Sequence, residues 1–211
     1  MNPKKEYYKN LANTVLKGME KRHMEGYYCE TIEEAKNLAL SLVPENTSVS
    51  FGGSVTLAET GILEALRNRN DITLLDRDNA NGPEEVKKIM HDALSCDYYF
   101  MSSNAITHEG ELVNIDGNGN RVAALIYGPE NVIVIAGMNK ITKNVEEGIS
   151  RVRNIASPPN CVRLNKNTPC AVNGVCGNCL ADTICDQIVI TRASRVPKRI
   201  KVILVGEVLG F

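Results

Sequence analysis

The chain has 211 residues, of which 43% are hydrophobic and 23% charged, and its formal net charge is −1. These values are ordinary for a globular protein and exclude a disordered chain. The near-neutral charge argues against nucleic-acid and anionic-membrane partners, because both require a basic surface. No apolar run approaches the roughly 20 residues of a membrane span, and the first residues lack the apolar core of a signal peptide. We therefore expect a cytoplasmic protein with no membrane partner.

The first quarter of the chain predicts two helices and a strand. Apolar residues recur at helical spacing over 4–24, which predicts an amphipathic helix ending near Gly26 and an N-terminal helical segment over about residues 1–27. Thr31 and Glu34 fit a capping box that opens a second helix. Residues 47–51 then form a short apolar run that predicts a strand.

A glycine-containing loop, residues 50–56, joins this strand to the next predicted helix. Glycines let a ligand approach the backbone closely, and hydroxyls at a helix start can hold an anion such as phosphate or carboxylate. Thr56 and Glu59 also fit a capping box, so a capped turn without a ligand is an equal alternative. The candidate ligand-binding residues here are Gly52, Gly53, Ser54 and Thr56.

Two more predicted strands, 72–75 and 97–101, flank a helix that starts at Pro83. Arg77 and Asp78, after the first of them, are interpreted as a solvated loop. Residues 102–121 then form an unusually polar stretch, in which glycines predict turns on both sides of a strand. Its amides, carboxylate and guanidinium suit either a polar metabolite with an anionic group or a buried hydrogen-bond network. The candidates are Asn104, Asn114, Asp116, Asn120 and Arg121.

The β-branched run within 131–136 predicts a fully buried strand. Asn139 and Lys140 follow its carboxyl end, where open α/β sheets bind ligands, and are further candidates. Residues 143–156 predict a helix that Pro158 and Pro159 end. Two strands, 188–190 and 200–205, close the chain, and the basic residues between them are interpreted as a solvated hairpin tip.

Five of the seven cysteines fall within 161–185. Cysteines in a chain without an export signal indicate thiols or metal ligands rather than a disulfide framework. The CxxC at Cys176 and Cys179 suits zinc or an iron–sulfur cluster. We predict as metal ligands Cys170, Cys176, Cys179 and Cys185, with Cys161 as a replacement. A disulfide or redox switch, and reduced thiols that pack a loop, are the alternatives.

Four segments resemble the LUD-domain family of lactate utilization proteins: 51–54, 104–107, 110–123 and 202–207. The cysteine segment is similar to that of single-domain members. The resemblance implies one domain over residues 1–211, with a cysteine-rich insertion at about 161–185. It also implies an α/β fold, a three-layer α/β/α sandwich around a mostly parallel sheet, similar to the ribose-5-phosphate isomerase and CoA-transferase superfamily. The strand–helix alternation agrees with that class.

The resemblance implies a protein of lactate or organic-acid utilization that binds a small anionic metabolite or cofactor. Iron–sulfur oxidoreductase subunits and a second copy of this chain are further candidate partners. One alternative is an isomerase or CoA-transferase-like enzyme, for which Glu111 and Asp116 are the candidate catalytic carboxylates. The other is a regulatory or assembly subunit without catalysis.

Overall fold

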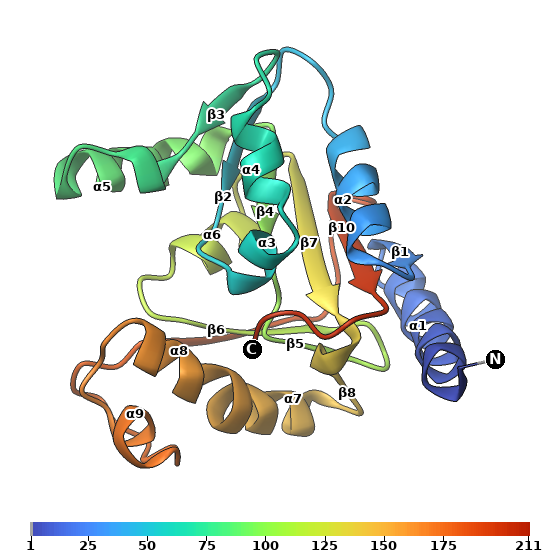
Figure 1. The fold of residues 1–211 in the computed structure, drawn as a ribbon, viewed down its shortest axis with the longest axis vertical. Helices are drawn as coiled ribbons and strands as arrows, with labels where there is room; N and C mark the ends of the chain where they lie inside the picture. The colour runs from blue at the N-terminus through green and yellow to red at the C-terminus, as the bar shows by residue number, and fades with distance from the viewer. Residues whose placement is uncertain (1) are drawn as a thin grey trace.

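The computed structural model describes residues 2–211, which fold around a six-stranded, wholly parallel sheet (Figure 1). Its central strand β7 contains the β-branched run Val132–Ile135, which is fully buried as the sequence predicts. In spatial order the strands are β1 (Glu25–Cys29), β10 (Ile200–Val205), β7 (Asn131–Gly137), β4 (Tyr98–Met101), β2 (Ser48–Phe51) and β3 (Thr73–Leu75).

Helices cover both faces of this sheet, because alternate residues of each buried strand point to opposite sides. Val132 and Val134 of β7 pack in a core cluster with α1 (Pro3–Lys21) and α6 (Asn120–Ile126), whereas Ile133 and Ile135 pack in a second cluster with the helices of the other face. The helices of that other face are α2 (Ile32–Ser41), α3 (Val55–Glu59) and α4 (Ile62–Arg67). The predicted α/β sandwich with a mostly parallel sheet is confirmed.

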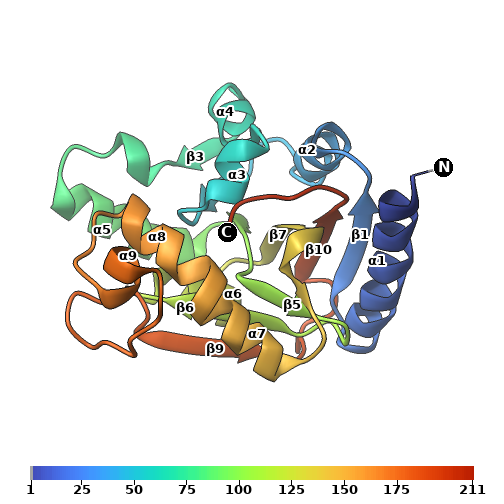
Figure 2. The ribbon, with the colours of Figure 1, turned by 60° about the horizontal axis from the view of Figure 1, so that its bottom comes forward.

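A second, smaller sheet lies below the first and is not predicted by the sequence (Figure 1). Its strand order is β8 (Ile141–Thr142), β5 (Ala105–Thr107), β6 (Leu112–Asp116) and β9 (Gln187–Thr191). Strands β5 and β6 form the predicted hairpin, with Gly110 in its turn at φ +84°. Helix α7 (Val145–Arg151) packs on β5 and β6, and α8 (Ser157–Arg163) continues across this layer (Figure 2).

The remaining elements are short connections apart from α5. They are η1 (Arg77–Asn79), α5 (Pro83–Asp92), η2 (Ala93–Ser95), η3 (Met138–Lys140), η4 (Val152–Ala156) and α9 (Pro169–Asn173). Within residues 2–211, no helix combines the length and the apolar character needed to cross a bilayer.

Three local predictions are wrong. The N-terminal helix ends at Lys21, and the last part of the predicted helical segment is instead β1. Its two consecutive tyrosines, Tyr27 and Tyr28, favour a strand. The predicted helix after the glycine loop is two helices, since Gly61 adopts φ +68° between α3 and α4. Its cap is Ser54, whose hydroxyl accepts a hydrogen bond from the Leu57 N–H, so the predicted capping box at Thr56 does not form.

Two predictions near the end of the chain are also wrong. Pro158 and Pro159 do not end a helix; they lie in the first turn of α8. The turn of π-helix at 152–156 joins α7 to α8 directly. Strands β9 and β10 belong to different sheets, so the basic residues between them are not a hairpin tip.

Candidate functional site

A polar cavity of about 440 Å³ opens where β2, β4, β6 and β7 end. The loops after β2, β4 and β7 meet there, as expected at the carboxyl edge of an open α/β sheet, and β6 of the second sheet ends beside them. Five cationic side chains and two carboxylates line the cavity: Arg77, Arg121, Lys140, Arg163 and Lys166, with Asp116 and Asp186. The cavity therefore has an excess of positive charge, although the whole chain carries a net charge of −1.

Arg121 of α6 is the centre of the polar cluster beside the cavity, and only 12% of its side chain is exposed. Its guanidinium donates to the Asn114 Oδ1 at 2.6 Å and to the Asn104 Oδ1 at 3.0 Å, both from the polar stretch. It also donates to two backbone carbonyls, Ser102 O at 3.1 Å and Ile115 O at 2.6 Å. These bonds tie α6 to the ends of β4 and β6.

Asp116 forms an ion pair with Arg121, with 3.3 Å between the Asp116 Oδ2 and the Arg121 Nε. Its other oxygen accepts from the Gly119 N–H at 3.1 Å, which closes the turn after β6. Two buried atoms of the cluster have no hydrogen-bond partner within residues 2–211: Asp116 Oδ2 and Asn114 Nδ2. The cluster is thus a hydrogen-bond network in which the Asp116 Oδ2 is held by its ion pair with Arg121 and not by a hydrogen bond.

Lys140 enters the cavity from η3, directly after β7, and is 4% exposed. Its Nζ donates to the Thr56 Oγ1 at 2.8 Å and to the Ser102 Oγ at 3.0 Å. Burial, followed by the positive charges of Arg151 and Arg121, lowers the pKa of Lys140 to about 7. Arg151 is held by backbone carbonyls, including Asn104 O at 2.6 Å.

The glycine loop borders the same cavity. A side chain at Gly53 would collide with the guanidinium of Arg77, so glycine lets Arg77 lie across the loop. A side chain at Gly52 would press on Tyr99 and Arg121 at 3.1–3.2 Å. At both positions a larger residue would have to displace a neighbouring side chain, Arg77 at Gly53 and Tyr99 or Arg121 at Gly52.

The structure brings most of the predicted site residues together. Those that line the cavity are Gly53, Ser54, Thr56, Asn104, Asp116, Asn120, Arg121 and Lys140. Gly52 and Asn114 lie behind this wall, in contact with Arg121. The Asn139 side-chain amide donates to the Leu209 carbonyl and accepts from the Leu209 N–H. These two bonds fix the last residues of the chain beside the cavity.

Glu111 lies outside the cavity, in the β5–β6 turn. Its carboxylate pairs with Arg22 at 3.2 Å and accepts from the Thr107 hydroxyl at 3.2 Å. The structure thus separates Glu111 from Asp116, and Glu111 joins the hairpin to the end of α1.

Sequence reasoning missed three of the cations that line the cavity, Arg77, Arg163 and Lys166, and two residues beside Lys140, Ser102 and Arg151. Arg77 was interpreted as part of a solvated loop, but it reaches back over Gly53. Ser102 and Arg151 were not singled out, although Ser102 follows the end of β4 and that position is a general signal for ligand contacts. Arg151 occupies an ordinary helix position with no comparable signal.

All seven cysteines are free thiols. Burial raises the pKa of Cys161 to about 11, and Cys170 is buried with its sulfur 3.4 Å from the Thr168 hydroxyl. Cys176 instead lies beside Arg153, whose guanidinium is 3.6 Å from its sulfur. Within residues 2–211, no three or more His, Cys, Asp or Glu side chains are arranged to hold a metal ion.

The zinc or iron–sulfur ligation by Cys170, Cys176, Cys179 and Cys185 therefore stays a prediction. Metal and acid-labile sulfide analysis of protein purified without oxygen tests it. The cysteine segment does contribute to the cavity, because Thr183 and Ile184 line its wall just before Cys185. Ile184 also packs against Gly117 of the turn after β6.

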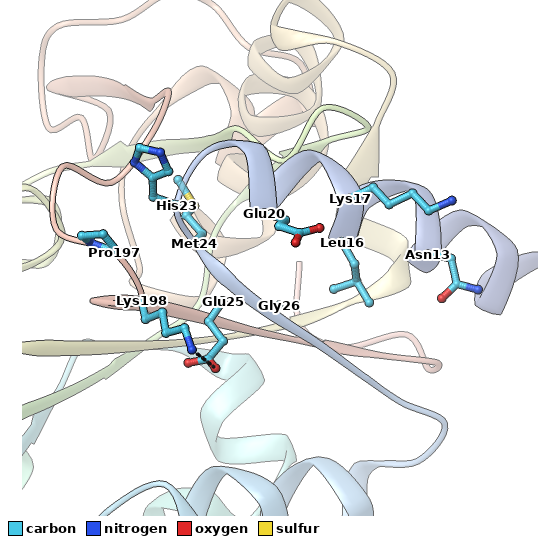
Figure 3. A pocket seen from close by; sticks show the side chains of 10 residues that line it. All are labelled: Asn13, Leu16, Lys17, Glu20, His23, Met24, Glu25, Gly26, Pro197 and Lys198. Atoms are coloured by element: carbon cyan, nitrogen blue, oxygen red, sulfur yellow. Dashed lines mark ion pairs between the residues drawn. The ribbon is translucent and has the colours of Figure 1, made fainter.

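A second cavity, of about 660 Å³, lies between α1 and the start of β1 (Figure 3). Its lining includes the apolar side chains of Leu16, Met24 and Pro197. Lys198 and Glu25 form a loose ion pair there, at 3.9 Å. None of the predicted site residues lies in this cavity, and its charges largely offset each other.

The fold and the cationic cavity define an α/β protein with a polar site at the carboxyl ends of parallel strands. The LUD-domain family model matches residues 12–205, and the chain belongs to the LUD-domain family. A DUF162 family protein from Deinococcus radiodurans has a similar structure, with a TM-score of 0.54 at 14% sequence identity. That match covers 94% of this chain and 98% of the other, and it supports the fold.

Weaker structural likenesses include two sugar-phosphate isomerases. Ribose 5 phosphate isomerase A from Neisseria gonorrhoeae matches at 17% identity and a TM-score of 0.35, over 55% of this chain and 56% of that one. 5-methylthioribose 1-phosphate isomerase from Pyrococcus horikoshii OT3 matches at 12% identity and a TM-score of 0.38, over 74% of this chain and 50% of that one. No curated protein matches the sequence.

Proposed function

We propose that the protein binds a small anionic metabolite in the polar cavity and acts in lactate or related organic-acid utilization. The observation that carries the binding proposal is the excess of cationic side chains around a 440 Å³ space at the carboxyl ends of four strands. That volume suits a compact metabolite, and guanidinium groups recognise carboxylate and phosphate through paired hydrogen bonds. The organic-acid role is supported by membership of the LUD-domain family.

The residues divide into a fixed part and an available part. The Arg121 guanidinium is already used by Asn104, Asn114 and two carbonyls, so it contributes mainly charge. Among the described residues 2–211, Arg77 has only a distant ion pair with Asp78, at 3.8 Å, and its guanidinium lies at the glycine loop. We therefore expect Arg77 to bind the anionic group directly.

Isothermal titration calorimetry with lactate, pyruvate, inorganic phosphate, ribose 5-phosphate and coenzyme A tests this proposal. We expect at least one anion to bind, and Arg77→Gln to weaken it about 10-fold or more, because a hydrogen bond to a charged group contributes roughly 1.5–3 kcal/mol. Arg195→Gln is the matched control, since Arg195 is exposed and lies outside the cavity. Absence of binding by every anion, or equal binding by the Arg77 variant, overturns the proposal.

A specific observation favours a second candidate function, the docking of a partner such as an iron–sulfur oxidoreductase subunit. The cysteine segment exposes apolar side chains at Val172 (78%), Val175 (65%) and Leu180 (91%). Exposed apolar side chains grouped in one segment are typical of protein interaction sites. Val172→Ser combined with Leu180→Ser should weaken co-purification with such a subunit and leave anion binding unchanged.

The enzyme alternative based on Glu111 has no support from the geometry, because Glu111 lies outside the cavity. Asp116 is the remaining carboxylate of that alternative, and it does line the cavity.

A further inference from the structure

Lys140 has an unusual position for a lysine. It follows the central strand β7 and is 4% exposed, yet it lines the cavity. Its amine is held between the hydroxyls of Thr56, from α3, and Ser102, after β4. Three separate elements therefore fix the nitrogen at the floor of the site.

The charges around this amine are mostly of its own sign. Within residues 2–211, no carboxylate oxygen lies within 4.0 Å of the Lys140 Nζ. Arg121 from α6 and Arg151 from α7 oppose its protonation, and only Glu59 from α3 favours it. Together with burial they hold the pKa of Lys140 at about 7, so a large share of the amine is neutral near neutral pH.

The hydrogen-bond partners fit the neutral form. A neutral amine has two N–H donors and one lone pair, whereas the ammonium has three donors. Two hydroxyl acceptors lie within 3.0 Å of the Nζ, which satisfies two donors and leaves the lone pair free. A lysine that is desolvated and placed next to other cations is the arrangement that activates amines as nucleophiles.

We propose that the Lys140 Nζ forms an imine with the carbonyl carbon of a small aldehyde or ketone that carries a carboxylate or phosphate group. This inference rests on the proposed anion-binding function and adds the class of ligand, a carbonyl compound. The cationic side chains would bind the anionic group and so place the carbonyl carbon of the ligand next to the Lys140 Nζ.

The step balances without an oxidant or a reductant. The nitrogen lone pair attacks the carbonyl carbon, and the carbonyl π electrons move to its oxygen. One proton passes from nitrogen to that oxygen, and the Thr56 and Ser102 hydroxyls are in contact with the Nζ to relay it. The remaining N–H proton then passes to the hydroxyl by the same route while the nitrogen electron pair forms C=N, so that water leaves with both amine protons and a C=N bond remains in place of C=O.

Borohydride trapping tests the inference. The protein is incubated with pyruvate or ribose 5-phosphate as carbonyl probes, reduced with sodium borohydride, and analysed by intact mass and peptide mapping. We expect one reduced adduct at Lys140, its amount at least 10-fold lower in Lys140→Arg and unchanged in Lys143→Met, which removes an exposed lysine three positions along. The rate of trapping in the unmodified protein should rise as pH increases through about 7.

The outcomes separate this inference from the proposed function. Calorimetric binding of a carbonyl probe without any adduct overturns the imine and leaves anion binding in place. Adducts spread over exposed lysines, or a rate that does not change with pH, also overturn the imine. Absence of binding by lactate, phosphate, coenzyme A and both carbonyl probes overturns the proposed function, and the imine with it. The pH dependence is measured on the unmodified protein, so the test does not depend on the folding of a variant.

Discussion

Two regions of the chain meet at the cavity, the polar cluster around Arg121 and the cysteine segment, and they are built in opposite ways. The cluster around Arg121 is held by strand ends, and its guanidinium makes four hydrogen bonds to buried partners. The cysteine segment, residues 161–185, contains one five-residue helix after α8, and its middle exposes Val172, Val175 and Leu180. One region is fixed by the core, and the other is attached to it mainly at its two ends.

This difference shows what the core of the protein specifies. Removal of the Arg121 guanidinium would leave several buried acceptors without a donor, so the hydrogen bonds of this cluster depend on one another. In the cysteine segment the buried thiols, Cys161 and Cys170, lie near its start, while Cys176 and Cys179 are half-buried. We therefore expect stability to depend on the arginine cluster, and chemical reactivity to concentrate in the cysteine segment.

The largest expected effect comes from Arg121→Met. It leaves the Asn104 and Asn114 oxygens and two backbone carbonyls without their donor, and leaves Asp116 as a buried unpaired charge. We expect the free energy of unfolding to fall by about 3–5 kcal/mol, as for other broken buried pairs. Urea unfolding followed by circular dichroism measures this. The free energy of unfolding of Arg195→Met should stay within about 0.5 kcal/mol of the parent. If Arg121→Met lost no more than that, the arginine cluster would not be the part on which stability depends.

The next effect concerns pH. The pKa of Lys140 is about 7 in the folded protein, against 10.5 for an unperturbed lysine, so between these values the unfolded chain binds more protons. The free energy of unfolding should therefore rise with pH above about 7, by a contribution approaching about 1.4 kcal/mol per pH unit.

Urea titrations of the parent and of Lys140→Met at several values from pH 6 to 8.5 measure this contribution as the difference between the two proteins. The upper limit avoids cysteines and tyrosines with raised pKa values, such as Cys96 at about 11, because those groups lower stability at higher pH. Lys140→Met should be the more stable protein at pH 6, and its advantage should shrink as pH rises. A constant difference between the two would show that Lys140 keeps its proton in the fold.

The same contrast explains how far the sequence could predict the molecule. The run Val132–Ile135 and the glycine at the β5–β6 turn carry strong local signals, and both elements form as predicted. Local signals failed where a distant partner decides the structure. The strand β1 exists because β10 lies beside it, and β10 is more than 170 residues away along the chain. The second sheet likewise joins β6 to β9 across the whole cysteine segment.

The candidate site shows the same limit. Glycines and polar residues at strand ends identified Gly53, Thr56, Asn104, Asp116, Arg121 and Lys140. The role of each residue was not visible in the sequence. Thr56 resembled a helix cap but binds Lys140, and Glu111 resembled a catalytic carboxylate but pairs with Arg22. These roles depend on which long side chains reach across the fold, and sequence spacing carries no information about that.

The smallest expected effect is a difference in thiol reactivity within the cysteine segment. A backbone N–H from Asn178 and the Arg153 guanidinium lower the pKa of Cys176, whereas burial raises the pKa of Cys185. Since the thiolate is the nucleophile, Cys176 should react faster with iodoacetamide at pH 7.5, and each unit between the two pKa values changes the thiolate fraction by about tenfold.

Timed alkylation followed by peptide mass analysis measures both rates in one sample, so Cys185 serves as the internal control. Arg153→Gln should slow Cys176 and leave Cys185 unchanged, because only Cys176 lies beside that guanidinium. Equal rates at the two cysteines would mean that the cysteine segment does not hold Cys176 against Arg153 in solution. In that case the Arg153 guanidinium would not set the pKa of Cys176, and the reactivity of the cysteine segment would depend on a bound partner.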